Sequence, residues 1–148
     1  MKIVIQRVLS ASVLIQQGTV SEIQRGFLVL LGIHNDDTKQ DVEYLVKKLI
    51  NLRVFPDESG KMNLSLTDID GQILLVSQFT LYADTKRGNR PSFIESATPD
   101  KAVPLYQLFI ELLTRLMGQK IKTGVFGADM KISLVNDGPV TVIIDSKN

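Results

Sequence analysis

The sequence has no cysteine and a single histidine, His34, and these two absences exclude several common kinds of active site. Without cysteine there can be no disulfide, no thiolate nucleophile and no cysteine-ligated metal. One histidine cannot build a multi-histidine metal centre, and no other cluster of ligand residues takes its place. We therefore expect neither a metal nor another cofactor.

The chain also lacks a strong net charge and a long apolar run. Its formal net charge is +1, so a nucleic-acid partner would have to bind a local basic patch. The first residues are interrupted by Gln6, Arg7 and Ser10 and contain no signal-peptide core. No apolar stretch approaches the roughly 20 residues that cross a membrane. We expect a cytoplasmic protein with no membrane partner.

The length and composition are those of one globular domain, spanning residues 1–148. Hydrophobic residues make up 44% of the 148 and charged residues 22%, which is ordinary for a soluble fold with one core. The run at residues 27–33 is apolar throughout and is typical of a strand buried on both faces. Alternation and apolar runs predict strands at residues 3–8, 12–15, 20–24, 27–33, 73–81, 121–126, 130–135 and 140–145.

Two amphipathic helices complete the prediction. The first begins after Thr38, a helix N-cap, and carries apolar residues at helical spacing up to Leu49. The second has an apolar stripe over residues 105–117 and ends at Gly118. Its start is open, because Thr98-Pro99-Asp100 is a good N-terminal signal whereas Pro104 would break or kink a helix begun there.

Many strands and two helices indicate an α+β fold. We predict a single domain in which a mixed, partly barrel-like β-sheet has the two amphipathic helices packed on one face.

A polar interruption of the strand at residues 76–83 (VSQFTLYA) is the first candidate for chemistry. Ser77, Gln78 and Thr80 break an otherwise apolar pattern. They are either ordinary residues of a half-buried strand or part of a ligand site at its end. A hydroxyl nucleophile needs an adjacent base, and His34 is far from Thr80 in the sequence.

Two loops leave similar alternatives open. Lys86, Arg87 and Arg90 lie in a loop rich in glycine and proline that is either simply solvated or recognises phosphate. In TGVFGADM, residues 123–130, Phe126 is either a core residue beside a turn or one wall of a site where small residues admit a ligand.

The segment NDGPVT, residues 136–141, is composed of turn formers between two predicted strands. From these residues alone a hairpin turn is the favoured interpretation. The alternative is a cis Gly138–Pro139 bond that projects its carbonyls into a site, although only about 5–6% of X–Pro bonds are cis.

Taken together, these segments resemble the D-aminoacyl-tRNA deacylase (D-tyrosyl-tRNA deacylase) family in order and spacing. The resemblance includes SQFTLYA (77–83), KRGNRPSF (86–93), TGVFGADM (123–130), NDGPVT (136–141), IQRVLSASV (5–13) and GKMNLSL (60–66). Each motif is weak by itself, but six in the same order cover essentially the whole chain.

The resemblance implies an editing hydrolase of translation quality control. It would cleave the ester of D-aminoacyl-tRNA, such as D-Tyr-tRNA, to free D-amino acid and tRNA. The implied partners are the 3′ end of aminoacylated tRNA and a second copy, in a homodimer whose active sites lie at the subunit interface, with no DNA partner. The resemblance also implies roles for individual residues. Catalysis would fall to Ser77, Gln78, Phe79 and Thr80, and chirality selection to the cis Gly138-Pro139 pair, which enters the partner's pocket and is held by Arg7. Phe126 and Met130 would contact the adenosine, and Lys86, Arg87 and Arg90 the tRNA phosphates.

A mechanism consistent with that assignment needs no histidine triad. We expect the Phe79 N–H to stabilise the oxyanion and the ribose 2′-hydroxyl to assist, with Thr80 as nucleophile ranked below this scheme. The Gly138 and Pro139 carbonyls would accept hydrogen bonds from the α-ammonium, so an L side chain would meet fixed backbone. Glycine has no side chain, so mischarged glycyl-tRNA should also be cleaved. The alternatives are a non-catalytic tRNA- or RNA-binding module and a Thr80-dependent esterase of small esters.

Overall fold

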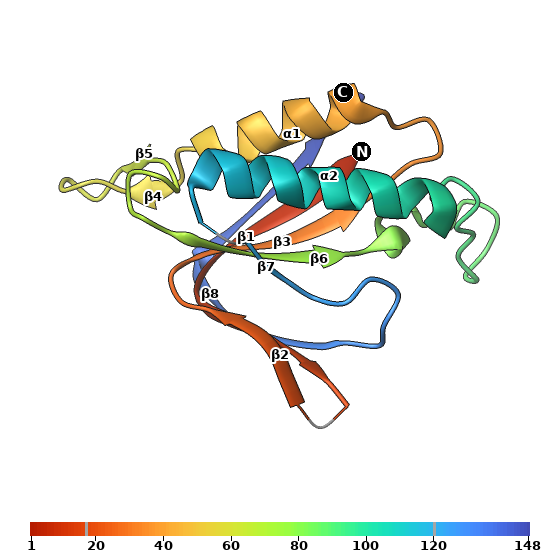
Figure 1. The fold of residues 1–148 in the computed structure, drawn as a ribbon, viewed down its shortest axis with the longest axis horizontal. Coiled ribbons are helices and arrows are strands. Elements are labelled where there is room, and N and C mark those ends of the chain that lie inside the picture. Colours follow the sequence, from red (N-terminus) through yellow and green to blue (C-terminus); the bar gives the residue numbers. More distant parts are fainter. Residues whose placement is uncertain (17, 120) are drawn as a thin grey trace.

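A computed structural model of the protein describes residues 1–16, 18–119 and 121–148 (Figure 1). The helices are α1 (Lys39–Asn51), α2 (Pro99–Met117) and the short 3-10 helix η1 (Phe79–Tyr82). The strands are β1 (Lys2–Ile15), β2 (Gly18–Ile23), β3 (Gly26–Gly32), β4 (Phe55–Pro56), β5 (Met62–Leu64), β6 (Gln72–Ser77), β7 (Lys122–Thr123) and β8 (Lys131–Asp145).

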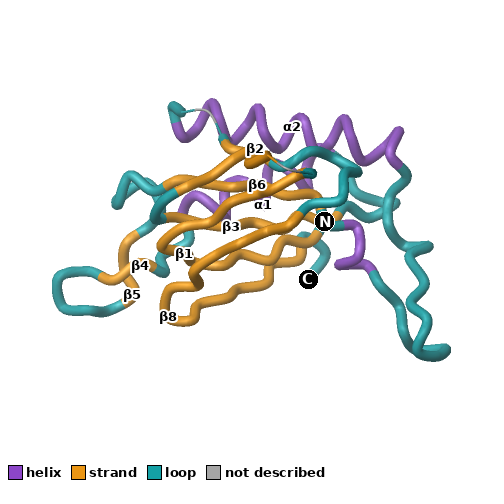
Figure 2. The backbone as a smooth tube through the Cα atoms, turned by 90° about the horizontal axis from the view of Figure 1, so that it is seen from below, coloured by secondary structure: helices purple, strands orange, loops and turns teal. Residues whose placement is uncertain are grey.

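The long first strand organises a mixed sheet. One edge of β1 pairs antiparallel with β3 over residues 2–8 and with β2 over residues 11–15, while its other edge pairs antiparallel with β8. β3 and β6 pair in parallel, as do β6 and β7. Because β1 changes partner near Ser10 and Ala11, the sheet bends there and partly closes on itself (Figure 2). The small residues that separate two predicted strands therefore lie inside one continuous strand.

α1 and α2 lie side by side across one face of the sheet, as the fold prediction requires (Figure 1). Between them and the sheet lies the larger core, which contains Ile3, Phe27, Leu45 and Phe109 at 0% exposure. Neither helix of the described chain is long and apolar enough to cross a membrane.

A second, smaller core lies on the other face of the sheet, inside its curl. Alternate residues of β3 point to the two cores: Phe27 and Val29 toward the helices, Leu28 toward the second core. This arrangement confirms that β3 is buried on both faces and explains why its sequence shows no polar alternation. Val13 and Val76 pack in the same second core.

Both helices begin at the signals that the sequence contains. The Thr38 backbone N–H donates to Asp41 Oδ2 at 2.8 Å, the return bond of a capping box at the start of α1. α2 begins at Pro99, directly after its N-cap Thr98, so the open question of its start is settled in favour of the earlier residue. Pro104 lies inside the helix. Because proline has no N–H, the helix lacks one hydrogen bond there, to the carbonyl four residues earlier.

Two strand predictions are wrong in their bounds. The strand predicted to reach Leu81 ends at Ser77, and the chain turns into η1. Its neighbour β3 ends at Gly32, so the last bond between the two strands runs from the Gln78 N–H to the Leu31 carbonyl, at 2.8 Å. The strand predicted over residues 121–126 is reduced to the two residues of β7, which pair with Leu74 and Leu75 of β6.

The hairpin interpretation of residues 136–141 is also wrong. The segment lies within β8, which runs unbroken from Lys131 to Asp145 and pairs with β1 on both sides of it. The register jumps between Gln6 and Val8, leaving several residues of β8 opposite one residue of β1, which is a bulge. The bond between Gly138 and Pro139 within this bulge is cis.

Candidate active site

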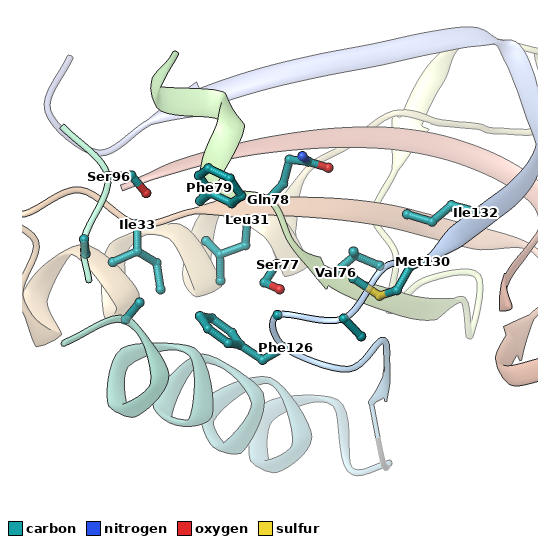
Figure 3. A pocket seen from close by; sticks show the side chains of 14 residues that line it. Leu31, Ile33, Val76, Ser77, Gln78, Phe79, Ser96, Phe126, Met130 and Ile132 are labelled. Carbon is teal, nitrogen blue, oxygen red and sulfur yellow. The ribbon is translucent and has the colours of Figure 1, made fainter. Parts of the chain in front are cut away.

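A cavity of about 280 Å³ opens at the end of β6 (Figure 3). Its lining comes from the ends of β3 and β6, the segment leading into α2, the loop before β8 and the first residues of β8: Leu31, Ile33, Val76, Ser77, Gln78, Phe79, Ser96, Ala97, Ala102, Phe126, Gly127, Ala128, Met130 and Ile132. Five residues that the sequence nominates (Ser77, Gln78, Phe79, Phe126 and Met130) are thus brought together by segments far apart in the chain.

The polar side of the cavity is the end of β6. Ser77 and Gln78 follow each other along an extended chain and point to opposite sides, the Ser77 hydroxyl toward Phe126 and the Gln78 amide away from it (Figure 3). Gln78 Nε2 donates to Thr80 Oγ1, so the Thr80 hydroxyl is already engaged. Thr80 itself does not line the cavity among the described residues.

Phe79 forms the rim. Its side chain is 57% exposed although it is a large aromatic, and its ring meets Phe93 edge to face with centroids 5.1 Å apart. Phe79 is also the first residue of η1, so its N–H has no acceptor within that helix. The rim therefore offers an apolar surface and a backbone donor at one residue.

The opposite wall is aromatic and thioether. The Phe126 ring lies 5.6 Å from that of Tyr106, whose hydroxyl donates to the Leu75 carbonyl at 3.3 Å. Burial raises the pKa of Tyr106 to about 12, so this phenol stays neutral and acts as packing. A Cβ at Gly124 would lie 2.5 Å from Met130 Sδ, so the absence of a side chain there makes room for the methionine.

None of the 14 described residues that line the cavity carries an ionisable side chain. The wall therefore provides hydroxyl, amide and backbone groups but no carboxylate, imidazole or amine for acid–base chemistry. His34 is engaged elsewhere: its Nε2 lies 2.7 Å from Glu95 Oε2, and its Nδ1 accepts the Asp36 N–H at 3.0 Å.

Arg7 and the Gly138–Pro139 pair lie together in the bulge and do not belong to the described lining of this cavity. Arg7 Nε donates to the Asp137 carbonyl at 3.0 Å, and another guanidinium nitrogen donates to the Val54 carbonyl. Gly138 has φ +129°, and a Cβ there would lie 3.0 Å from Arg7 Nη2. The nearly buried Arg7 side chain thus packs against the backbone of the bulge and bonds it to the segment after α1.

The basic loop forms a third location. Lys86, Arg87 and Arg90 are exposed in the loop between Asp84 and Ser92, whose backbones pair with each other. The loop follows η1 along the chain and returns through Phe93, the partner of the rim aromatic Phe79. The loop that carries these cations therefore returns to the cavity rim at Phe93.

Sequence reasoning missed part of the lining. Ser96 and Ala97 come from the segment before α2 and Ala102 from its first turn, while Leu31 and Ile33 lie at and just after the end of β3. The small residues are the one signal that could have been noticed, since three of them gather where α2 begins and leave space beside it. Leu31 and Ile33 could not have been separated from the ordinary apolar residues of a buried strand.

Comparisons with known proteins identify the family of the chain. The family described as D-Tyr-tRNA(Tyr) deacylase matches residues 4–145. A protein of Cytophaga hutchinsonii named D-aminoacyl-tRNA deacylase is 59% identical over 98% of this chain and 97% of its own. One of the same name from Flavobacterium psychrophilum is 57% identical over 100% of this chain and 99% of its own.

A solved structure described as c-Myc DNA Unwinding Element Binding Protein superposes with a TM-score of 0.92. It is 44% identical to this chain and covers 98% of it, as the chain covers 98% of that structure. The name of that protein attributes DNA binding to it, whereas the relatives above are named for hydrolysis of D-aminoacyl-tRNA. The family match over nearly the whole length and the identities above one half show that this chain belongs to the D-Tyr-tRNA(Tyr) deacylase family, and that it is an enzyme of this hydrolase family.

Proposed function

We propose that the protein removes D-amino acids, and glycine, from mischarged tRNA in a cavity completed by a second copy of the chain. The observation that carries this proposal is the convergence of Ser77, Gln78, Phe79, Phe126 and Met130 on one cavity whose described lining has no ionisable group. An activated ester needs only an oriented water and oxyanion stabilisation, which neutral and backbone groups can supply.

The oxyanion donor in this proposal is the Phe79 N–H. It has no acceptor within η1, and its residue lines the cavity. One such donor is typically worth about 10²–10³-fold in rate. The ribose 2′-hydroxyl of the terminal adenosine supplies the assistance that this wall lacks, while Phe126 and Met130 contact the adenosine. Thr80 has a lesser role, because its hydroxyl accepts from Gln78 and lies outside the described lining.

Selection of D over L is assigned to the carbonyls of Gly138 and Pro139, provided by the other copy. Both residues are exposed, and the backbone beneath them is held by Arg7. Charge-assisted hydrogen bonds from the substrate α-ammonium to two fixed carbonyls would hold the α-carbon in one orientation. An L side chain would then point into rigid backbone and a D side chain toward solvent. Glycine would meet no obstacle, so glycyl-tRNA would be a substrate.

A homodimer is supported by what β8 leaves uncovered. Among the described residues, this strand pairs with β1 on one edge and with no strand on the other. The side chains of Leu9, Val135 and Ile143 are 52%, 51% and 65% exposed on the same two strands that hold the bulge. A second copy covering this surface would bury exposed apolar area while it received Gly138–Pro139 in its cavity.

The remaining roles follow from the substrate. Lys86, Arg87 and Arg90 are proposed to contact tRNA phosphates, in keeping with their exposure and with the return of their loop to the rim at Phe93. A cytoplasmic location is proposed because charged tRNA is used there, and no DNA partner is expected.

Single-turnover deacylation of D-Tyr-tRNA, L-Tyr-tRNA and Gly-tRNA tests the proposal. We expect the D and glycyl esters to be cleaved and the L ester to be spared. The Thr80→Val variant should keep most of the activity, whereas the wild type should not cleave a substrate that ends in 2′-deoxyadenosine. An acyl-enzyme trapped on Thr80, or hydrolysis of small esters without tRNA, would instead establish the esterase alternative. Binding of tRNA without turnover would establish the non-catalytic one.

A further inference from the structure

A basic hollow lies on the outer side of α1, remote from the cavity lining. Its volume is about 670 Å³, and its lining residues are Tyr44, Lys47, Lys48, Asn51, Leu52 and Arg53. Lys47, Lys48 and Arg53 are exposed, as is Tyr44, whose side chain is 41% exposed. We call this surface, defined by these six residues, the α1 groove.

The cations of the α1 groove are not neutralised within the chain. Among residues 1–16, 18–119 and 121–148, no carboxylate oxygen lies within 4.0 Å of Lys47, Lys48 or Arg53. The nearby carboxyl of Asp68 has a lowered pKa, chiefly because of hydrogen bonds from Ser65 and least because of Arg53. The groove therefore presents three positive charges on a chain whose formal net charge is only +1.

Part of the α1 groove is held in place. Arg53 Nε donates to the Asn63 carbonyl at 2.7 Å, and its Nη2 donates to the Asn63 side chain. Lys48 Nζ lies 5.6 Å from the centroid of the Tyr44 ring. The Asn51 amide donates to the Lys47 carbonyl at 2.8 Å, so the groups left for phosphate are the two lysine ammonium groups and the guanidinium N–H groups of Arg53 that Asn63 does not use. Three cations without an ion-pair partner in the described residues favour a polyanionic partner.

The α1 groove lies close to Gly138–Pro139, the pair proposed to select D over L. Arg53 is followed by Val54, whose carbonyl accepts from Arg7, and Arg7 also donates to the Asp137 carbonyl directly before Gly138. The groove is thus one residue and two hydrogen bonds from the bulge. It lies at the C-terminal end of α1, whereas the cavity of the same chain lies near the start of α2, at the opposite end of the helical layer (Figure 1).

We propose that the α1 groove of one copy binds the phosphate backbone of the acceptor stem of a tRNA whose 3′ end occupies the cavity of the other copy. The inference rests on the proposed function, which sends Gly138–Pro139 into the partner's cavity. That step carries the neighbouring groove toward the same cavity mouth. One tRNA would then contact both subunits, its terminal ester one cavity and its stem the opposite groove.

The first test replaces Lys47 and Lys48 with alanine in the full-length protein. Against D-Tyr-tRNA we expect KM to rise about tenfold or more with kcat unchanged, and the slope of log KM against log salt to fall by about 1 for each phosphate that the variant no longer binds. D-Tyr-adenosine, which has no stem, should be cleaved as by the wild type. The control, Lys39→Ala with Arg115→Ala, removes the same charge from exposed positions outside the groove and should leave KM within about twofold.

The second test asks which copy binds the stem. Ala128→Trp would fill one cavity from its loop. In mixed dimers we compare the Lys47→Ala, Lys48→Ala pair on the chain that carries the blocked cavity with the same pair on the chain that carries the open cavity. KM should rise only in the first arrangement, since that groove serves the open cavity of the other chain. A rise only in the second would overturn binding across the dimer.

The outcomes separate this inference from the function beneath it. If the wild type cleaves D-Tyr-tRNA selectively but the Lys47→Ala, Lys48→Ala variant matches it in KM and salt slope, the groove proposal fails and the function stands. If the wild type does not cleave D-Tyr-tRNA, the proposed function fails, and fluorescence anisotropy with uncharged tRNA still measures the groove. The groove proposal is overturned if the variant and the wild type bind tRNA with equal affinity, or if the groove prefers an acidic peptide over tRNA.

Discussion

The cavity and the β8 bulge differ in almost every physical respect, although both consist of residues from a single proposed site. The cavity is formed by side chains around neutral polar groups and has no described ionisable residue in its lining. The bulge presents backbone at Gly138–Pro139 over an arginine that holds it from beneath. One region has room for a substrate and the other has rigid acceptors but encloses no part of that cavity. The separation of the two regions within one chain is what the proposed site, completed by a second copy, would require.

The largest expected effect on activity comes from adding one carbon atom to the bulge. In Gly138→Ala the new Cβ would lie 2.8 Å from Val140 Cγ2 and 3.0 Å from Arg7 Nη2, at φ +129° where L residues are strained. We expect D-Tyr-tRNA deacylation to fall by about 100-fold or more, because displaced carbonyls no longer orient the substrate. Single-turnover kinetics measure this loss.

A matched glycine separates the role of the bulge from backbone strain. Gly60 also has positive φ, at +80°, but a Cβ there would meet nothing within 4 Å. Gly60→Ala should cost about 1–2 kcal/mol of stability from the backbone conformation and leave deacylation unchanged. If both variants lost activity equally, general destabilisation rather than the bulge would be responsible.

The next effect comes from the support beneath the bulge. Arg7→Lys keeps the charge but cannot reproduce the bonds to both Asp137 and Val54. We expect about a 10- to 100-fold fall in activity on D-Tyr-tRNA and a lower D-over-L ratio, measured by parallel deacylation of the two esters.

Arg25→Lys is the matched control for that prediction. The Arg25 guanidinium stacks 5.4 Å from the Phe55 ring, and among the described residues no side-chain hydrogen bond or ion pair joins it to the bulge. Its substitution should leave the ratio unchanged. An unaltered ratio in Arg7→Lys would show that the carbonyls are held without the arginine fork.

The cavity residues could be predicted from the sequence more readily than the bulge, for a physical reason. The cavity residues Ser77 and Phe126 stand out locally, as polar or aromatic interruptions of strands, and α1 is fixed by its own cap and apolar stripe. The bulge is different, because Asn136 to Thr141 has the local chemistry of a turn. Only the pairing of both halves of β8 with β1, and the arginine across from them, makes it part of one strand.

The same reason explains the strand that ends early. Residues beyond Ser77 have good strand formers, but a strand needs a neighbour, and β3 stops at Gly32. The sequence of a strand does not show where its neighbouring strand ends. The role proposed for Gly138–Pro139 comes entirely from the family resemblance, which depends on the order of all six motifs rather than on any one of them.

A smaller effect is expected at the cavity wall. A Cβ at Gly124 would lie 2.5 Å from Met130 Sδ, and a flexible thioether can move aside. Gly124→Ala should therefore push Met130 toward the substrate and raise KM about fivefold with little change in the D-over-L ratio. Steady-state kinetics on both esters would separate this from the Arg7 effect.

The double variant Gly124→Ala, Met130→Ala tests that mechanism. Shortening the methionine gives the new methyl group room, so KM should return toward that of Met130→Ala alone. If the two effects simply multiplied, Gly124 would act through the backbone and not through Met130.

The smallest effect on activity is expected at Asp41, which belongs to neither region but whose charge supports the fold that separates them. Burial alone would raise the pKa of this carboxyl, but hydrogen bonds from Ser146, Thr38 and Lys147 outweigh it and hold the pKa well below its usual range. A lowered folded pKa means that the stabilisation is complete above the unfolded pKa of about 3.9 and is lost as the pH falls through the folded value. Asp41→Asn should thus lose about 1–3 kcal/mol in urea unfolding at pH 7 and progressively less below about pH 4, with the D-over-L ratio unchanged throughout. An equal loss at pH 7 and at acid pH would mean that Asp41 acts through its shape at the helix start and not through its charge.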